Sequence, residues 1–384
     1  MGKLLSRISA SFINAIVEKQ LGRLDFVEDY TGTLHSGMIA RVPISGSTNA
    51  DTGETLAYVR KGSTRNLIVL LMGGGVSWNA ETANYSMNPE SAAHPKTPAL
   101  YAPSLSKMTE YSTFCLSKTP GLLSTGDENL FADWNLIVIN YVTGDFHVGR
   151  HDYPYTDREG NQRILHHQGY SNFQKAMERC KAFFPETDKL LIAGGSAGAF
   201  AVPALAADIM AYYPECDDVT VFSDSALLLM ESYRTVARDV WGAEESLVEA
   251  IHSSDISADW FERLYAMKGE SIRYLYANSA QDYLLATFQN YMDTGSYSVT
   301  QERCNKFKED LRHHVQRLRN ACPRMGFYIS DHKPLQPKTA GTEHCMILNG
   351  NLSNKKNAPV CGMQWLYDAV NGKIYDVGME LLSK

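Results

Sequence analysis

The sequence lacks several features that would each have fixed its class at once. None of its apolar runs approaches the length of a membrane span, although 44% of its 384 residues are hydrophobic. We therefore expect a soluble protein with a large buried core. No internal repeat or low-complexity linker interrupts the chain, which favours one domain over residues 1–384. The absence of an apolar export signal with a cleavage site predicts a cytoplasmic location.

Paired cysteines and an excess of basic residues are missing as well. The seven cysteines are scattered and include no CxxC pair, so neither a zinc site nor a disulfide framework is indicated. The formal net charge of −7 argues against a nucleic-acid partner, because such proteins usually carry a basic face.

Metal-binding motifs are absent too, although histidines gather in one region. The sequence has no HExxH helix, and we predict that it needs neither a metal ion nor a cofactor. We expect the clustered residues to line the mouth of a pocket or to hold loops; they are Asp145, His147, Arg150, His151, His166 and His167.

What the sequence does contain is an alternation of apolar runs and helical patterns. Continuous apolar runs are typical of strands that are covered on both faces. Their alternation with helices predicts an α/β fold with a doubly wound, mostly parallel sheet and helices on both faces. The expected strands are 66–72, 134–141, 189–193, 219–222, 271–277 and 326–330, and the expected helices are 170–184, 197–213, 281–291 and 300–319.

Three further segments stand apart from this alternation. Residues 1–26 have apolar side chains at helical spacing and predict an amphipathic helix that packs on the body, with contact to a membrane surface as the alternative. Residues 78–131 are polar and rich in Ser, Thr, Pro and Asn, and predict an inserted loop or lid. Residues 232–267 are helical and predict a cap over the site.

One serine lies where a strand is expected to become a helix. Residues 194–198 read Gly-Gly-Ser-Ala-Gly and match G-x-S-x-G, with an apolar run before them and an Ala-rich helical pattern after them. A serine on so sharp a turn is lifted clear of the sheet, and small residues two positions away let the chain pass. Since a hydroxyl is a weak nucleophile without a base, Ser196 predicts a histidine and an acid nearby.

Chain order then selects the partners of the serine. The fold places the acid after a later strand and the histidine after the last one, which favours Asp282 and His344. Asp224 ends the strand directly after the serine and remains the alternative acid, and His332 remains the alternative base. The three glycines 73–75 close an early strand and are expected to turn backbone amides toward the serine.

Taken together, these motifs resemble the pectin acetylesterase/Notum family of α/β hydrolases. The resemblance covers residues 60–370 and is carried by LLMGGGVSW (70–78), AGGSAGAFA (193–201), VFSDSALL (221–228), ANSAQD (277–282) and EHCMI (343–347). It implies a cofactor-free esterase with Ser196 as nucleophile, Asp282 as acid and His344 as base. It also implies that the amides of Gly74, Gly75 and Ala197 form the oxyanion hole. Val76 and Ser77 stand where the family usually has Trp and Cys, which puts pectin as the substrate in doubt.

The sequence as a whole predicts a serine carboxylic-ester hydrolase that forms an acyl-enzyme. Its partner is expected to be a small-molecule or carbohydrate ester, for instance an acetylated carbohydrate such as pectin. An acyltransferase or thioesterase using the same triad and a catalytically inactive, ligand-binding relative are the alternatives. The acyl and alcohol parts of the substrate and the oligomeric state stay open.

Overall fold

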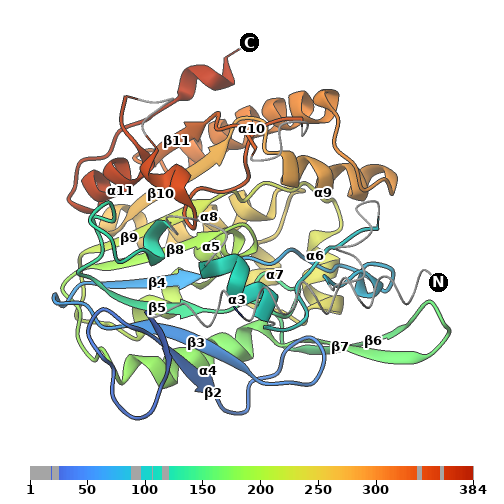
Figure 1. Cartoon of the computed structure of the whole chain (residues 1–384). Coiled ribbons are helices and arrows are strands. Elements are labelled where there is room, and N and C mark those ends of the chain that lie inside the picture. The colour runs from blue at the N-terminus through green and yellow to red at the C-terminus, as the bar shows by residue number, and fades with distance from the viewer. Residues whose placement is uncertain are drawn as a thin grey trace.

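A nine-stranded sheet forms the centre of the computed structural model (Figure 1). The structure describes residues 19, 26–87, 97–105, 107–114, 121–334, 340–354 and 359–383. The strands lie in the order β1-β2-β3-β5-β4-β8-β9-β10-β11. Their bounds are β1 Val27–Asp29, β2 Ile39–Ile44, β3 Thr55–Arg60, β4 Leu67–Leu71, β5 Asn135–Ile139, β8 Leu190–Gly195, β9 Val219–Asp224, β10 Arg273–Ser279 and β11 Gly326–Ser330.

Six neighbouring strands of the sheet are parallel, and each was expected from its apolar run. They are β5, β4, β8, β9, β10 and β11. β4, β5, β8 and β9 are buried along their whole lengths, because helices cover both faces of the sheet. Toward the other edge of the sheet, which β1 forms, β3 pairs antiparallel with both β5 and β2. The prediction of a doubly wound, mostly parallel sheet is thus confirmed.

Neighbouring side chains on β9 show which helix covers which face. The Ser223 hydroxyl donates to the Ala199 carbonyl in α5 at 2.7 Å, whereas the Phe222 ring packs on Trp365 of α11 with ring centroids 5.7 Å apart. Since successive strand residues point to opposite faces, α5 and α11 lie on opposite sides of the sheet. The four predicted helices form as α4 Gly169–Lys181, α5 Ala197–Ala211, α9 Tyr283–Thr294 and α10 Gln301–Ala321, and α11 covers Gly362–Val370.

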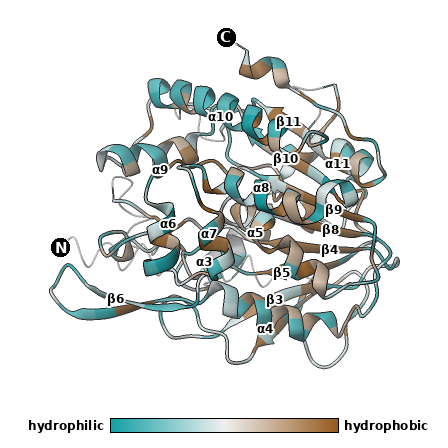
Figure 2. Ribbon diagram, turned by 180° about the vertical axis from the view of Figure 1, so that it is seen from behind, coloured by the Kyte–Doolittle hydropathy of each residue, from teal (hydrophilic) through white to brown (hydrophobic). Residues whose placement is uncertain are grey.

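A two-stranded hairpin projects from the body of the molecule. β6 (His151–Thr156) pairs antiparallel with β7 (Gln162–His167), and both views show the pair extending away from the sheet (Figures 1 and 2). The central strands are apolar, while α10 and the hairpin are largely hydrophilic (Figure 2). Within the described ranges no helix is long and apolar enough to cross a membrane.

The predicted loop or lid 78–131 connects β4 to β5. Its described parts include helix α3 (Lys107–Phe114) and two short 3₁₀ turns, Thr82–Asn84 and Gly121–Leu123. Several of its apolar side chains are fully buried, among them Leu100, Leu122 and Phe131. These parts of the segment therefore pack into the body of the protein.

The predicted cap 232–267 contains α6 (Tyr233–Thr235), a π-helical turn (Val236–Val240), α7 (Glu245–Ala250) and α8 (Ile256–Lys268). α8 packs against α5 and α10, and so joins the helical layer that covers one face of the sheet. The predicted amphipathic helix 1–26 lies outside the described residues, except for Lys19 and Phe26.

Candidate active site

Ser196 occupies a strained turn between β8 and α5. Its backbone has φ 55° and ψ −126°, a region that L-residues rarely adopt and that is typical of a functional constraint. A Cβ on Gly194 would lie 2.3 Å from the Gly198 carbonyl oxygen, and a Cβ on Gly198 would lie 2.0 Å from that of Leu71. Only glycine fits at either position. The G-x-S-x-G pattern is therefore dictated by how closely the chain passes itself.

His344 and Asp282 form a hydrogen-bonded pair close to this turn. His344 Nδ1 lies 2.7 Å from Asp282 Oδ2, and the Asp282 side chain is completely buried. Asp282 also caps α9, because its Oδ1 accepts the backbone N–H groups of Leu284 and Leu285 at 3.1 and 3.0 Å. The two backbone N–H groups hold one oxygen of the carboxylate, and the other oxygen is thereby directed toward the imidazole.

The environment of His344 favours the protonated imidazole. Burial by itself lowers the pKa of a histidine. The charge of Asp282 and the hydrogen bond to it outweigh burial, with a further contribution from Cys345, so that the pKa of His344 is raised well above 6.5. An imidazole that is stabilised as imidazolium suits a base that must accept a proton during the reaction.

The loop that carries His344 lies against the serine turn. A Cβ on Gly195 would be 2.8 Å from the Ile347 side chain and 3.6 Å from Cys345 Sγ. Among the described contacts, His344 Nε2 lies 3.3 Å from Cys345 Sγ, and no hydrogen bond joins it to Ser196 Oγ. In structures without substrate such catalytic hydrogen bonds are often long and tighten only when substrate binds.

The glycine turn after β4 contains an N–H group, that of Gly75, with no backbone partner in the described part of the chain. Gly75 forms a bridge with Tyr101, in which Ala102 N–H donates to Gly74 O and Val76 N–H donates to Leu100 O at 2.8 and 2.6 Å. The Gly75 N–H therefore points away from residues 100–102. Gly75 has φ +79°, and a Cβ there would lie 1.9 Å from Leu100 O, so this turn requires glycine. A Cβ on Gly73 would lie 2.7 Å from Ser196 Cβ, which places the turn beside the serine.

The side chains of the two alternative residues, Asp224 and His332, have other partners than the His344–Asp282 pair. The Asp224 carboxylate is buried and accepts the N–H groups of Met346 and Ile347, instead of contacting the imidazole of His344. His332 meets the His344 loop through its own carbonyl, which accepts the Glu343 N–H at 2.7 Å. Burial lowers the pKa of His332, and its Nε2 has no partner among the described residues.

The histidine cluster ties loops together. His147 Nε2 lies 2.8 Å from the Met72 carbonyl, and His167 Nδ1 lies 2.8 Å from the Thr143 carbonyl. His151 and His166 contact the Val240 carbonyl and the Asp152 carboxylate in the same way. The group whose side chains lie close enough to share a metal ion, in the described part of the chain, is not this cluster. It consists of His252, Asp259 and Glu262. The Arg317 guanidinium already binds both of its carboxylates, and supplies the positive charge there.

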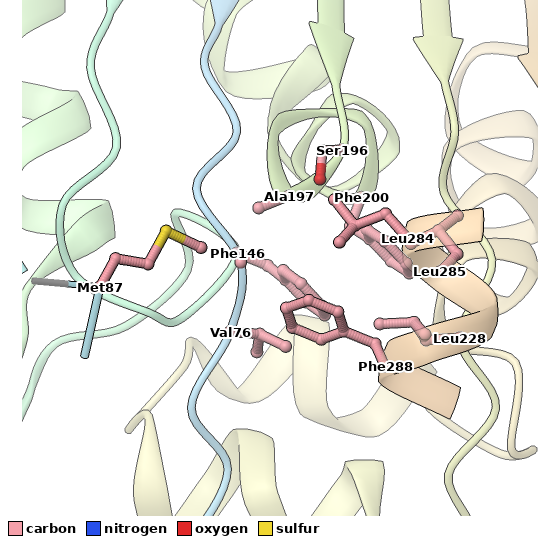
Figure 3. Close-up of a pocket in the computed structure, with 11 residues that line it drawn as sticks. Val76, Met87, Phe146, Ser196, Ala197, Phe200, Leu228, Leu284, Leu285 and Phe288 are labelled. Carbon is pink, nitrogen blue, oxygen red and sulfur yellow. The ribbon is translucent and has the colours of Figure 1, made fainter. Parts of the chain in front are cut away.

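An apolar pocket opens beside Ser196 (Figure 3). Its cavity volume is about 30 Å³, and the pocket continues into open solvent. Its walls come from six separate segments of the chain, and their residues are Gly75, Val76, Met87, Phe146, Ala197, Phe200, Leu228, Leu284, Leu285 and Phe288. Apart from Gly75 and Ala197, which the sequence analysis named for the oxyanion hole, sequence reasoning missed these wall residues, because scattered apolar side chains look like ordinary core. The pocket can hold a hydrocarbon group within reach of the serine hydroxyl.

Comparisons with known proteins agree with this arrangement. The pectinacetylesterase family matches residues 51–256, more than half of the chain. That range includes the glycine turn and Ser196 and ends before Asp282. A crystal structure of the Wnt deacylase Notum from Drosophila aligns with 88% of this chain and 95% of its own, with a TM-score of 0.56 and 17% sequence identity. At that identity the likeness shows a shared fold. No curated protein sequence matches the chain.

Proposed function

The chain belongs to the pectinacetylesterase family of carboxylic ester hydrolases, and we propose that Ser196, His344 and Asp282 are its catalytic triad. The observation that carries this proposal is the geometry around one strained turn. His344, in a 2.7 Å hydrogen bond to the buried Asp282, belongs to a loop that packs on the turn of Ser196. A serine, a base and an oriented acid in this relation form the general apparatus of acyl transfer.

Each residue then has a defined role in the reaction. His344 Nε2 takes the proton of Ser196 as the hydroxyl oxygen attacks the ester carbonyl, and Asp282 holds the imidazolium that results. The N–H groups of Gly75 and Ala197, with that of Gly74, stabilise the oxyanion. The imidazolium gives its proton to the leaving alcohol. Water, activated by the same imidazole, hydrolyses the acyl-enzyme and releases the acid.

The pocket beside Ser196 supports an apolar acyl group in the substrate. Its walls are aliphatic and aromatic, so they suit the hydrocarbon part of an acyl group better than a polar group. Each additional methylene buried there stabilises the complex by roughly 0.8 kcal/mol. We therefore favour esters whose acyl chain has several carbons over acetate esters, including those of pectin.

Labelling and kinetics of Ser196→Ala test this function directly. The variant should lose more than about 10³-fold in kcat on p-nitrophenyl esters and should no longer react with a fluorophosphonate probe. Ser223→Ala is the matched control, because Ser223 lies on the neighbouring strand and bonds to α5. A Ser196→Ala protein that keeps a tenth of the activity would exclude the acyl-enzyme.

A cytoplasmic location stays a prediction. The described cysteines are all free thiols, and most of them are buried; they are Cys180, Cys216, Cys304, Cys322, Cys345 and Cys361. Unpaired thiols are expected in a reducing compartment, which supports that prediction.

A further inference from the structure

Asp224 contacts both halves of the site. It ends β9 opposite Gly195 of β8, and its carbonyl oxygen accepts the Ser196 N–H at 2.9 Å. Its carboxylate reaches the other way: Oδ2 accepts the N–H groups of Met346 and Ile347 at 2.7 and 2.8 Å. Asp224 therefore forms hydrogen bonds both with the turn that carries Ser196 and with the loop that carries His344.

The loop needs such a restraint, because its backbone is strained. Cys345, between His344 and Met346, has φ 57°, a left-handed conformation that a non-glycine residue adopts only where its surroundings hold it. The two N–H groups that follow Cys345 converge on one oxygen of Asp224. Hydrogen bonds to an ionised acceptor are about twice as strong as those to a neutral one. The charge of Asp224 thus stabilises the conformation that presents His344.

We propose, on the basis of the function proposed above, that Asp224 is a positioning residue that holds the His344 loop in register with Ser196. It acts through the two backbone N–H groups and not as the acid of the triad, since Asp282 already occupies Nδ1 of the imidazole.

The carboxyl group of Asp224 can lose its charge within the working pH range. Burial raises its pKa to about 6, against the opposing effect of the two N–H groups and of His344. The titratable groups that face it are His344 and Cys345 from the loop and Tyr276 from β10. The Ser225 hydroxyl donates to its Oδ1 at 3.2 Å. Below pH 6 the loop would be held by a neutral carboxyl.

Two substitutions separate positioning from mere stability. Asp224→Ala removes the carboxylate oxygen that accepts both N–H groups. The variant should have a kcat lower by about 100-fold, as expected for a small misplacement of a catalytic group. Asp224→Asn keeps one amide oxygen for both N–H groups but removes the charge. Its kcat/KM should be about tenfold below wild type at pH 8, the effect of losing charge assistance. The ratio of the wild-type kcat/KM to that of Asp224→Asn should approach one near pH 5, because the wild-type carboxyl is then neutral as well.

Asp259→Ala is the matched control. Asp259 is equally buried and also accepts two backbone N–H groups on one oxygen, those of His252 and Ser253, both at 3.0 Å, but on α8. It should lower the melting temperature without lowering kcat. A wild-type to Asp224→Asn ratio that is constant from pH 5 to 8, or an Asp224→Ala variant within threefold of wild type, would overturn the proposal. If Ser196→Ala and His344→Ala also stayed active, the proposed function itself would fail.

Discussion

Backbone strain in this protein is concentrated around one small volume. The five non-glycine residues with positive φ in the described part of the chain are Phe146, His147, Ser196, Ser225 and Cys345. Phe146 lines the pocket, and His147 binds the carbonyl that precedes the glycine turn. Ser225 and Cys345 contact Asp224. Because strained residues persist only where the structure over-determines them, their clustering supports the proposed site independently of any motif.

The pH dependence of the reaction follows from the environment of His344. Since the pKa of His344 is raised well above 6.5, kcat/KM should fall below a midpoint that also lies above pH 6.5, by about tenfold per pH unit. Asp282→Asn removes the charge that raises this pKa. We therefore expect the midpoint to move to lower pH while kcat falls by roughly 10⁴-fold. Steady-state kinetics between pH 5 and 9 measure both effects.

His332→Ala provides the control for this profile, because its side chain does not contact the His344–Asp282 pair in the structure. It should leave the midpoint in place. A midpoint that is unchanged in Asp282→Asn, or one that disappears in His332→Ala, would contradict the assignment of the base.

Residues that share a motif could be found from the sequence, whereas residues that meet only in space could not. G-x-S-x-G and chain order singled out Ser196, Asp282 and His344, and the structure brings the last two together. The contact of Asp224 with Met346 depends on sheet register and on a loop 122 residues away. Likewise, nothing in the sequence signals that Cys345 Sγ lies beside Nε2 of the base.

At the scale of elements, the strands with continuous apolar runs were predictable, and the more polar strands at one side of the sheet and in the hairpin were not. β4 is wholly apolar and β5 is apolar after its first residue, Asn135, so composition alone identifies them. β2 reads Ile-Ala-Arg-Val-Pro-Ile and β6 reads His-Asp-Tyr-Pro-Tyr-Thr. Each contains a proline, which lacks an N–H donor and disfavours a strand. β2 accommodates Pro43 because β1 pairs only with residues 39–41 and, among the described residues, leaves that side of β2 unpaired beyond them. Their pairing comes from neighbours in space, and a single-sequence pattern does not encode it.

Helix α9 links the acid to substrate choice. Asp282 caps its N-terminus, and Leu284, Leu285 and Phe288 on the same helix line the pocket. Phe288→Ala enlarges the pocket without touching Asp282. We expect the preferred p-nitrophenyl ester to shift toward longer acyl chains, with a loss of about tenfold in kcat/KM for the ester that suits the wild type best. Burial of fewer apolar groups around that chain accounts for a loss of this size.

The distal end of α9 supplies the control for this experiment. Met292 packs only partly buried against the core and does not line the pocket, so Met292→Ala should leave the chain-length profile unchanged. An unaltered profile in Phe288→Ala would show that the acyl group binds somewhere else.

At the scale of the whole molecule, buried acids and buried histidines have opposite effects on the free energy of unfolding as the pH falls. Burial raises the pKa of Asp145 and of Asp224 to about 6. The folded state then binds protons that the unfolded state has lost, and these acids favour folding more strongly as the pH falls from 6 to 4. Burial lowers the pKa of His147 to about 4 and that of His167 to about 3. These histidines stay neutral in the fold and disfavour folding as the pH falls below 6.5.

Replacement of His167 isolates the histidine contribution. Below pH 6.5 the unfolded chain takes up a proton on this residue that the folded chain refuses, which costs about 1.4 kcal/mol of stability per pH unit. His167→Asn keeps an N–H donor for the Thr143 carbonyl but cannot titrate. Between pH 7 and pH 5 it should therefore lose about 2 kcal/mol less unfolding free energy than the wild type, as measured by urea denaturation at each pH. His313→Asn, on the exposed face of α10, should follow the wild type, because its ring is in water before and after unfolding. If the wild type, His167→Asn and His313→Asn all lost the same unfolding free energy between pH 7 and pH 5, His167 would take up its proton in the folded state.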